Sequence, residues 1–341
     1  PRKPRVEYAG AVYHVMSRGN HSQKVFRTDG DCGRFLDTLG EVCGRMGWKV
    51  HAYVLMGNHY HLLLETPEAN LVEGMRWLQG TYTKRFNAGH REWGHLFQGR
   101  YKAIPVEAGS GYFPAVASYI HLNPVRRKGW DFGRERLEDY RWSSYPAYVG
   151  KGRRTDWLGV ARVLDGLGLA DTAGGRRKYA EYMAGRVEEV RQSDQPWKAD
   201  ENWQKIRRGW HLGGEGFRRE MLERVGQTLD TGRRASYSGD EVREHGEACA
   251  EEWIAKGLAA LGLTDSDLAG LRMNSPEKYA LAWLVRRHAG VRPAWIKERL
   301  KMGTATGFAS FLVRLEGARK GDWGYEAWGQ VKNLVRGAGR E

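Results

Sequence analysis

Residues 49–66 have the sequence KVHAYVLMGNHYHLLLET, and this stretch decides the fold class. Residues 49–56 and 59–66 are rich in apolar and β-branched side chains, which favours strands. The Gly57-Asn58 pair between them is typical of a tight turn. The stretch therefore predicts two neighbouring antiparallel strands.

Further elements are predicted on both sides of this hairpin. Residues 11–17 and 101–107 have strand patterns. Residues 29–46, 71–87 and 111–122 carry apolar side chains at spacings of three and four, which indicates helices. The order β-α-β-β-α-β predicts a ferredoxin-like α+β domain, with an antiparallel sheet, helices on one face and a further helix after the last strand.

Strand patterns end near residue 140, and the rest of the chain is predicted to be helical. We expect a domain of residues 1–150, a helical connector of residues 151–234 and a helical domain of residues 235–341. In the last of these, residues 293–300 and 304–316 flank a short turn containing glycine. This pair is a candidate helix-turn-helix for DNA binding, and an ordinary helical hairpin is the alternative.

The charge of the chain points to a polyanionic partner. Its 341 residues include 55 Lys and Arg against 41 Asp and Glu, a net charge of +14. Residues 1–150 hold 21 basic and 14 acidic side chains, and the remainder holds 34 and 27, so both parts carry +7. Nucleic acid is the expected partner, and a merely soluble basic protein is the alternative.

Cysteine use and hydropathy exclude several other classes. Three cysteines without a Cys-x-x-Cys pair predict neither a disulfide framework nor a thiolate zinc site. The N-terminal residues lack the pattern of a secretory signal, and no apolar run has the ~18 residues that span a bilayer. We therefore expect a cytoplasmic, nucleoid-associated protein without a membrane partner.

Two histidines in the predicted strand 59–66 are candidate metal ligands. Side chains alternate along a strand, so His59 and His61 point to one face and Tyr60 to the other. Two neighbouring imidazoles suit a divalent metal, and a pair of surface histidines without a metal is the alternative. A zinc hydrolase generally needs a third His or Cys and a nearby acid, and no His-Glu-x-x-His motif occurs.

A tyrosine and an asparagine form the second candidate pair. Tyr119 and Asn123 lie four residues apart in SYIHLNPV and would share one face of a helix. An amide oxygen suits Mg²⁺ or Mn²⁺, and two imidazoles with one amide leave coordination positions for phosphate oxygens. The alternative is a half-buried tyrosine and an asparagine that ends the helix before Pro124.

Four blocks of the first 150 residues resemble the HUH single-tyrosine transposases, in particular the branch of transposases associated with repetitive extragenic palindromes (REP-associated tyrosine transposases). The blocks are RKPRVEYAGAVYHVMSRGN (2–20), YVLMGNHYHLLL (53–64), HLFQGRYKAIPV (95–106) and SYIHLNPVRRKGW (118–130). The resemblance implies an HUH endonuclease-like fold. It also implies that His59, His61 and Asn123 hold Mg²⁺ or Mn²⁺ and that Tyr119 is the nucleophile.

The resemblance implies transesterification on single-stranded DNA near hairpins, through a 5′-phosphotyrosine intermediate and a free 3′-hydroxyl. Rejoining then needs no ATP, which agrees with the absence of a Gly-x-x-x-x-Gly-Lys-Ser/Thr loop from the sequence. Two alternatives stay open, namely a catalytically silent DNA-binding regulator of the same family and a zinc-dependent hydrolase. The sequence leaves open whether the protein is a monomer or a homodimer.

Several basic and polar residues are candidate DNA contacts, and a solvated basic face is the alternative. By the resemblance, the N-terminal arm reads a short guide next to the hairpin. The candidates are Arg2, Lys3 and Arg5 in the arm, Arg100, Lys102, Arg126, Arg127 and Lys128 near the predicted chemistry, and Thr304, Thr306 and Arg314 on the candidate recognition helix.

Overall fold

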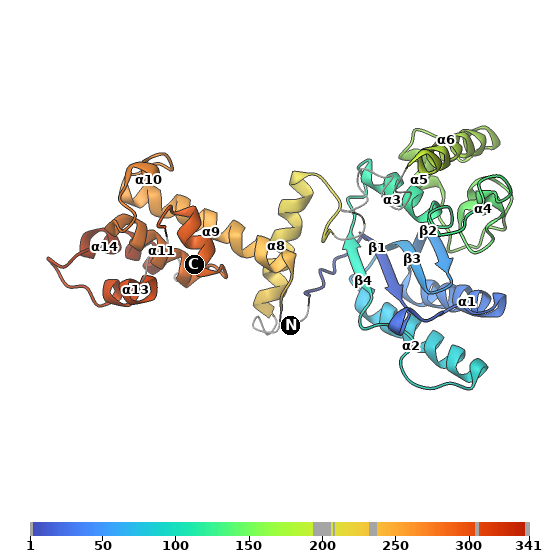
Figure 1. Ribbon diagram of the computed structural model, residues 1–341, viewed down its shortest axis with the longest axis horizontal. Helices are drawn as coiled ribbons and strands as arrows, with labels where there is room; N and C mark the ends of the chain where they lie inside the picture. Colours follow the sequence, from blue (N-terminus) through green and yellow to red (C-terminus); the bar gives the residue numbers. More distant parts are fainter. Residues whose placement is uncertain (1–2, 194–205, 207–208, 232–236, 304–306, 338–341) are drawn as a thin grey trace. The chain divides into compact units, whose positions relative to one another are not determined.

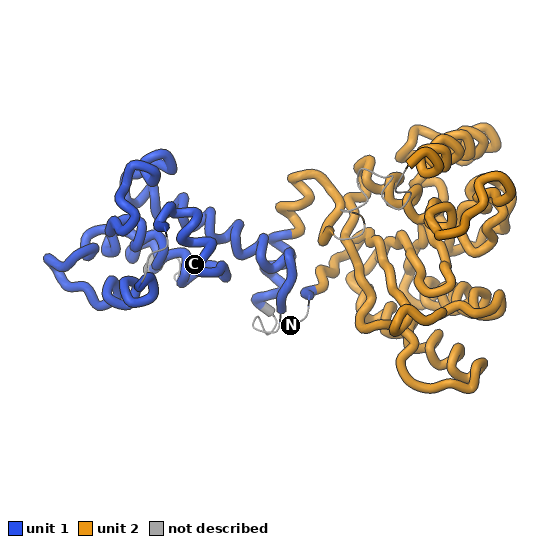
Figure 2. Tube along the Cα trace, viewed as in Figure 1, with its two compact units in different colours: residues 1–4, 222–341 blue, residues 5–221 orange. Residues whose placement is uncertain are grey.

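The computed structural model describes residues 3–193, 206, 209–231, 237–303 and 307–337. The chain forms two compact units (Figure 2). One consists of residues 5–221, and the other of residues 1–4 and 222–341. We call them the sheet unit and the helical unit.

The sheet unit contains four strands in the order β2-β3-β1-β4. They are β1 (Ala11–Arg18), β2 (Lys49–Met56), β3 (His59–Thr66) and β4 (Lys102–Pro105), and every neighbouring pair is antiparallel (Figure 1). This is the strand order of a ferredoxin-like sheet, so the predicted fold class is confirmed.

Two helices, α1 (Asp29–Met46) and α2 (Leu71–His90), cover one face of the sheet (Figure 1). The Phe35 ring on α1 packs 4.8 Å from the ring of Tyr60 on β3 and 5.1 Å from the ring of Tyr82 on α2. These aromatic contacts join both helices to the sheet in a single core.

Local signals fix the ends of α1. The side chains of Thr28 and Asp31 form a reciprocal capping box at its start. The helix ends at Gly47, whose φ of 68° lies in the left-handed region that favours glycine. Before α1, a short 3₁₀ turn, η1 (Asn20–Ser22), follows β1.

The opposite face of the sheet is covered by α3 (Tyr112–His121), which packs against β2 and β3. The chain then adds η2 (Leu137–Asp139), α4 (Tyr145–Tyr148), α5 (Ala161–Asp165) and α6 (Ala173–Gln192). Their buried side chains belong to the same hydrophobic cluster as the sheet. The sheet unit therefore extends past residue 150, and the predicted connector of residues 151–234 is divided between the two units.

The helical unit is built around α11 (Pro276–His288), which packs against α9, α13 and α14. The Ser275 side chain caps α11, and Pro276 occupies its first turn. The other helices are α8 (Glu215–Thr231), in which the boundary between the units falls, α9 (Asp240–Leu261), α10 (Asp267–Gly270), α12 (Pro293–Arg299), α13 (Phe308–Glu316) and α14 (Tyr325–Gly337).

Helices α12 and α13 lie where the helix-turn-helix is predicted. Helix α13 begins at Phe308, and residues 304–306 lie outside the described residues. A bilayer-spanning helix is not found in the part of the chain that the structure describes. The three cysteines are free thiols.

Candidate active site

The strand register places the two predicted histidines on the face of the sheet that α3 covers. His61 pairs with Met16 of β1, and Met16 in turn pairs with Lys102 of β4. His59 pairs with Arg18 of β1. Directly paired residues point to the same side of a sheet, so all five side chains share one face. The rings of His59 and His61 are 5.2 Å apart between centroids.

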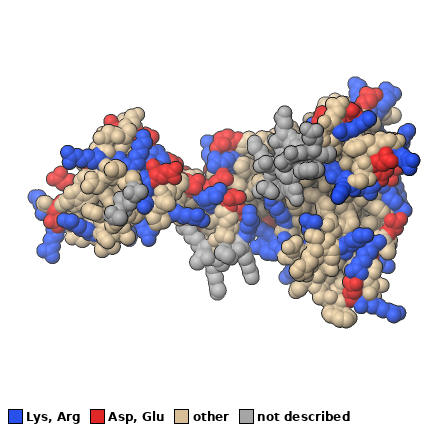
Figure 3. Space-filling model, in the orientation of Figure 1, with Lys and Arg blue, Asp and Glu red and all other residues tan. Residues whose placement is uncertain are grey.

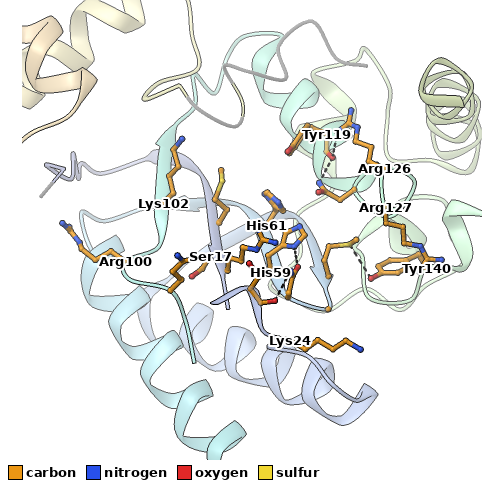
Figure 4. Close-up of a pocket in the computed structure, with 18 residues that line it drawn as sticks. Ser17, Lys24, His59, His61, Arg100, Lys102, Tyr119, Arg126, Arg127 and Tyr140 are labelled. Carbon is orange, nitrogen blue, oxygen red and sulfur yellow. Dashed lines mark hydrogen bonds between the residues drawn. The ribbon is translucent and has the colours of Figure 1, made fainter. Parts of the chain in front are cut away.

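This face forms the floor of a cleft of about 810 Å³ (Figure 4). The volume lies in the range of sites that hold small ligands or single nucleotide units. The predicted residues that line the cleft are His59, His61, Arg100, Lys102, Tyr119, Asn123, Arg126 and Arg127. Residues from β1, β3, β4 and the end of α3 therefore meet at one place.

Tyr119 lies on α3 with only 5% of its surface exposed. Its ring stands edge-on to two imidazoles, with centroids 5.7 Å from His61 and 5.8 Å from His14. On another side, the Arg126 guanidinium carbon lies 4.8 Å from the centroid of the ring, and Arg126 Nη1 donates a hydrogen bond of 3.4 Å to the Tyr119 carbonyl. The Tyr119 ring thus lies between the imidazoles of His14 and His61 on one side and the Arg126 guanidinium on another.

Asn123 lies beyond the helix, which corrects the prediction that it shares a helical face with Tyr119. Helix α3 ends at His121, and Pro124 has no N–H with which to continue the helical hydrogen bonds to the Ile120 carbonyl. Asn123 Nδ2 donates to the carbonyls of Tyr119 at 2.9 Å and Ile120 at 3.4 Å. Both amide hydrogens thus face the helix end, and no hydrogen bond to Oδ1 is found among the described residues.

The donors present fit a divalent cation. His59 Nδ1 lies 2.8 Å from Asn58 Oδ1, and since that oxygen only accepts, Nδ1 carries the proton and Nε2 the lone pair. The Asn58 amide is oriented by a second bond, from its Nδ2 to the Ser22 carbonyl. Two imidazole nitrogens and one amide oxygen are ligands that Mg²⁺ and Mn²⁺ accept. Groups of three or more His, Cys, Asp or Glu suited to a metal are not found in the described parts of the chain.

The sequence reasoning missed His14, which lies behind the metal-binding candidates. His14 is fully buried on β1, and its Nε2 lies 2.9 Å from His61 Nδ1. Burial lowers the pKa of His14 to about 3, and a contact with the backbone of Ile206 offsets this only in part. Strand alternation in AVYHVMSR, which places His14 with Met16 and Arg18, was the available signal.

Basic side chains surround the histidine pair (Figure 4). Two of them, Arg18 and Lys24, line the cleft but were not predicted. Arg127 also pairs with Glu135, and it lies near Tyr140, which completes this side of the cleft. Other Lys and Arg side chains are spread over the displayed surface of both units (Figure 3). The local excess of cations suits a phosphate backbone.

The predicted N-terminal arm is bound to the protein itself. The Arg5 guanidinium stacks 3.6 Å from the centroid of the Tyr101 ring and donates to the Tyr101 carbonyl at 3.2 Å. Burial lowers the pKa of Arg5. Lys3 pairs with Glu241 at 3.5 Å within the helical unit. Arg2 lies outside the described residues.

The remaining DNA-binding candidates lie away from the cleft or cannot be placed. Lys128 is exposed next to Arg127 but does not line the cleft. Arg314 is exposed on α13 in the helical unit. Thr304 and Thr306 lie outside the described residues.

Residues 7–123 match the family model described as "Transposase IS200 like", which covers about a third of the chain. No curated protein sequence matches the chain. Among solved structures, a REP-associated tyrosine transposase bound to a REP hairpin is 18% identical, with a TM-score of 0.37 over 47% of this chain and 92% of that one. The matched segment contains both histidines of the cleft, Tyr119 and Asn123. Residues 7–123 of the chain are therefore similar to the IS200-like transposases.

Proposed function

We propose that the protein is a metal-dependent transposase that cuts and rejoins single-stranded DNA near hairpins, with Tyr119 as the nucleophile. One observation carries this proposal. The Tyr119 ring, the His59 and His61 imidazoles and the Asn123 amide line the same cleft, although they come from two different elements and a turn. A catalytically silent relative would have no need to keep all four groups together.

The basic residues of the cleft bind and orient the DNA backbone in this proposal. Lys102 and Arg100 lie toward one side of the histidine pair, and Arg126 and Arg127 toward the other (Figure 4). A strand that passes between them brings one phosphodiester next to His61 and Tyr119. Fixing the phosphate and the phenol in one geometry supplies much of the rate enhancement of such a reaction.

The chemical step is an exchange of one ester for another. The phenolic oxygen of Tyr119 attacks the phosphorus as its proton is lost, and the bond from phosphorus to the 3′-oxygen breaks. The products are a 5′-phosphotyrosine on Tyr119 and a DNA end with a 3′-hydroxyl. Attack of a 3′-hydroxyl on this ester restores the phenol and rejoins DNA, so no ATP is consumed.

His59, His61 and Asn123 are the residues that would hold the metal. A phenol has a pKa of ~10 and is a poor nucleophile near neutral pH. Bound Mg²⁺ or Mn²⁺ supplies positive charge that polarises the phosphate and stabilises the developing negative charge. Arg126, whose guanidinium lies over the Tyr119 ring, adds positive charge that favours the phenolate.

We also propose that the helical unit contacts DNA through α12 and α13. Both helices end in basic residues, namely Lys297 and Arg299 on α12 and Arg314 on α13. Arg299 is engaged in ion pairs with Glu251 and Asp265, which leaves Lys297 and Arg314 as the candidate phosphate contacts. The loss of either side chain should weaken binding to all sequences to a similar degree.

A covalent-capture experiment tests the main proposal. Hairpin-flanked single strands are labelled at the 3′ end and incubated with the protein in Mg²⁺, Mn²⁺ or EDTA, followed by denaturing electrophoresis. We expect labelled protein with either metal, no labelled protein in EDTA, and a phosphotyrosine in the tryptic peptide that contains Tyr119.

Three outcomes of this experiment contradict the proposal in different ways. Specific binding without any adduct indicates a silent regulator. Cleavage with two free ends and no adduct indicates hydrolysis. An adduct that forms equally well in EDTA excludes the proposed role of the metal.

A further inference from the structure

A buried imidazole supports His61 from the side opposite to the cleft. His14 lies on β1, two residues before Met16, which is the cross-strand partner of His61. His14 Nε2 and His61 Nδ1 are 2.9 Å apart, and the two rings are stacked with centroids 5.1 Å apart. His14 has no exposed surface, and His61 has only 6%.

One hydrogen bond between two neutral imidazoles has two forms, with opposite consequences for the site. In the first form, His14 Nε2 donates, which places the remaining proton of His61 on Nε2, where it blocks coordination. In the second form, His61 Nδ1 donates and His14 Nε2 accepts, which leaves the lone pair on His61 Nε2. Only the second form lets His61 bind a metal through the nitrogen that faces away from His14.

The environment of the second His14 nitrogen favours this second form. A neutral His14 that accepts at Nε2 carries its proton on Nδ1, which needs an acceptor. Nδ1 has no hydrogen-bond partner of good geometry among the described residues, but the backbone of Ile206 raises the pKa of His14, as a nearby acceptor does. Because Nε2 faces His61, we assign this contact to Nδ1. A backbone carbonyl accepts but never donates, so this contact stabilises the Nδ1–H form of His14.

We propose that His14 is a positioning residue that accepts the His61 Nδ1 proton and thereby keeps the lone pair of His61 Nε2 available to a divalent metal. This inference rests on the proposed function, because it concerns the same metal site. Metal-ligating histidines generally donate their other ring N–H to a fixed acceptor, and loss of such an acceptor typically lowers metal affinity about 10–100-fold. Ile206 lies beyond residues 7–123, so the proton position on His14 also depends on a part of the chain outside the family match.

The first test measures metal affinity directly, without a cleavage reaction. Mn²⁺ binding is followed by electron paramagnetic resonance in the full-length protein and in His14→Leu, His14→Gln and His51→Leu. His51→Leu is the matched control, since His51 is also buried on the sheet but bonds to Glu65 and the Gly159 carbonyl and does not line the cleft.

We expect the dissociation constant for Mn²⁺ to rise about 10–100-fold in His14→Leu, which has no acceptor. His14→Gln offers an amide oxygen to His61 Nδ1 and should recover most of the affinity. His51→Leu should bind Mn²⁺ like the wild type. Unchanged affinity in His14→Leu, or an equal loss in His51→Leu, overturns the inference.

The second test reads the tautomer in the metal-free wild-type protein. Two-bond ¹H–¹⁵N correlation spectra of ¹⁵N-histidine-labelled protein distinguish the two neutral forms of each imidazole. We expect His61 as the Nδ1–H tautomer, and the Nε2–H tautomer overturns the inference even if His14→Leu fails to fold. If the wild type binds no Mn²⁺ at all, the metal dependence in the proposed function is contradicted. The tautomer of His61 then still shows whether His14 accepts its Nδ1 proton.

Discussion

The ring of Tyr119 stands edge-on to the ring of His61, at a centroid distance of 5.7 Å and an angle of 79°. Tyr119 belongs to α3 and His61 to β3, so the packing of α3 on the sheet sets the distance between the proposed nucleophile and His61. His121 lies two residues after Tyr119 on α3. It is buried and forms hydrogen bonds with the hydroxyls of Tyr179 on α6 and of Ser144. These contacts from α6 and Ser144 thus hold α3, which carries Tyr119, in place.

Replacement of the proposed nucleophile should abolish the chemical step but leave DNA binding in place. Tyr119→Phe removes only the phenolic oxygen, so covalent adduct is expected to disappear while DNA affinity stays within a few-fold of the wild type. Tyr112→Phe, at the start of the same helix and outside the cleft, is the matched control and should form adduct normally. The amount of adduct and the affinity are measured on the same hairpin substrate. Adduct in Tyr119→Phe but not in Tyr112→Phe would assign the nucleophile to Tyr112.

The two histidines that we propose as metal ligands should differ in their effect on stability. His61→Ala removes a buried side chain and leaves His14 without its partner, so the free energy of unfolding should fall by about 1–3 kcal/mol. His59 is half-buried, whereas His61 is buried, so His59→Ala should cost less. Urea denaturation in EDTA checks this order. Equal losses would show that the His14–His61 contact adds little to folding.

Sequence patterns were sufficient to predict the framework of the sheet unit. The predicted bounds of α1, β2 and β3 agree with the structure, because capping residues, a two-residue turn and continuous apolar runs are all local signals. Helix α2 continues to His90, past the predicted end at residue 87, and it ends where Arg91 adopts a left-handed conformation with a φ of 55°.

The parts of the site that were missed depend on contacts between distant segments. His14 and His61 are 47 residues apart in sequence, and only the register of β1 with β3 brings them together. Lys24 enters the cleft from the loop after η1, where no periodic pattern exists. The role of Arg5 as a partner of Tyr101 was equally hidden, because a basic N-terminus has the same composition whether it is free or packed.

An ion-pair cluster at the start of α6 should give a measurable pH dependence. Arg154 and Arg176 bond to Asp171, and the hydrogen bonds from Arg154 are the main cause that lowers the pKa of Asp171 to about 2. Because the folded pKa is below the unfolded value of ~3.9, this carboxylate stabilises the fold above about pH 4 and ceases to do so as the pH falls through 2.

The variant Asp171→Asn should therefore lose about 1 kcal/mol at pH 7, after allowance for partial solvent exposure. The loss relative to the wild type should shrink toward zero between pH 4 and pH 2. Asp165→Asn, which alters an exposed carboxylate without an ion pair among the described residues, is the control and should stay near the wild type at every pH. A deficit of Asp171→Asn that is the same at pH 7 and pH 2 would attribute its effect to packing instead of charge.

Two truncated variants should show which part of the chain supports the active site and which part binds DNA. A variant that ends at residue 150 lacks the buried side chains of α5 and α6, including Tyr179, the partner of His121. It also lacks Leu212, whose backbone pairs with Pro105 and Glu107 at the end of β4. We expect this variant not to fold, as measured by circular dichroism and thermal unfolding.

A variant that ends at residue 221 keeps every buried residue of the sheet unit and should fold and form covalent adduct on a short hairpin substrate. If the helical unit contributes phosphate contacts, the affinity of this variant falls and depends less on salt. Each lost contact removes about 0.7 from the slope of log affinity against log salt on single strands, and about 0.9 on duplex. Affinity at several salt concentrations, measured beside single-turnover cleavage, gives both quantities. An unchanged slope with lost cleavage would mean that the helical unit supports the active site, because a DNA-binding role alone leaves chemistry on a short substrate intact.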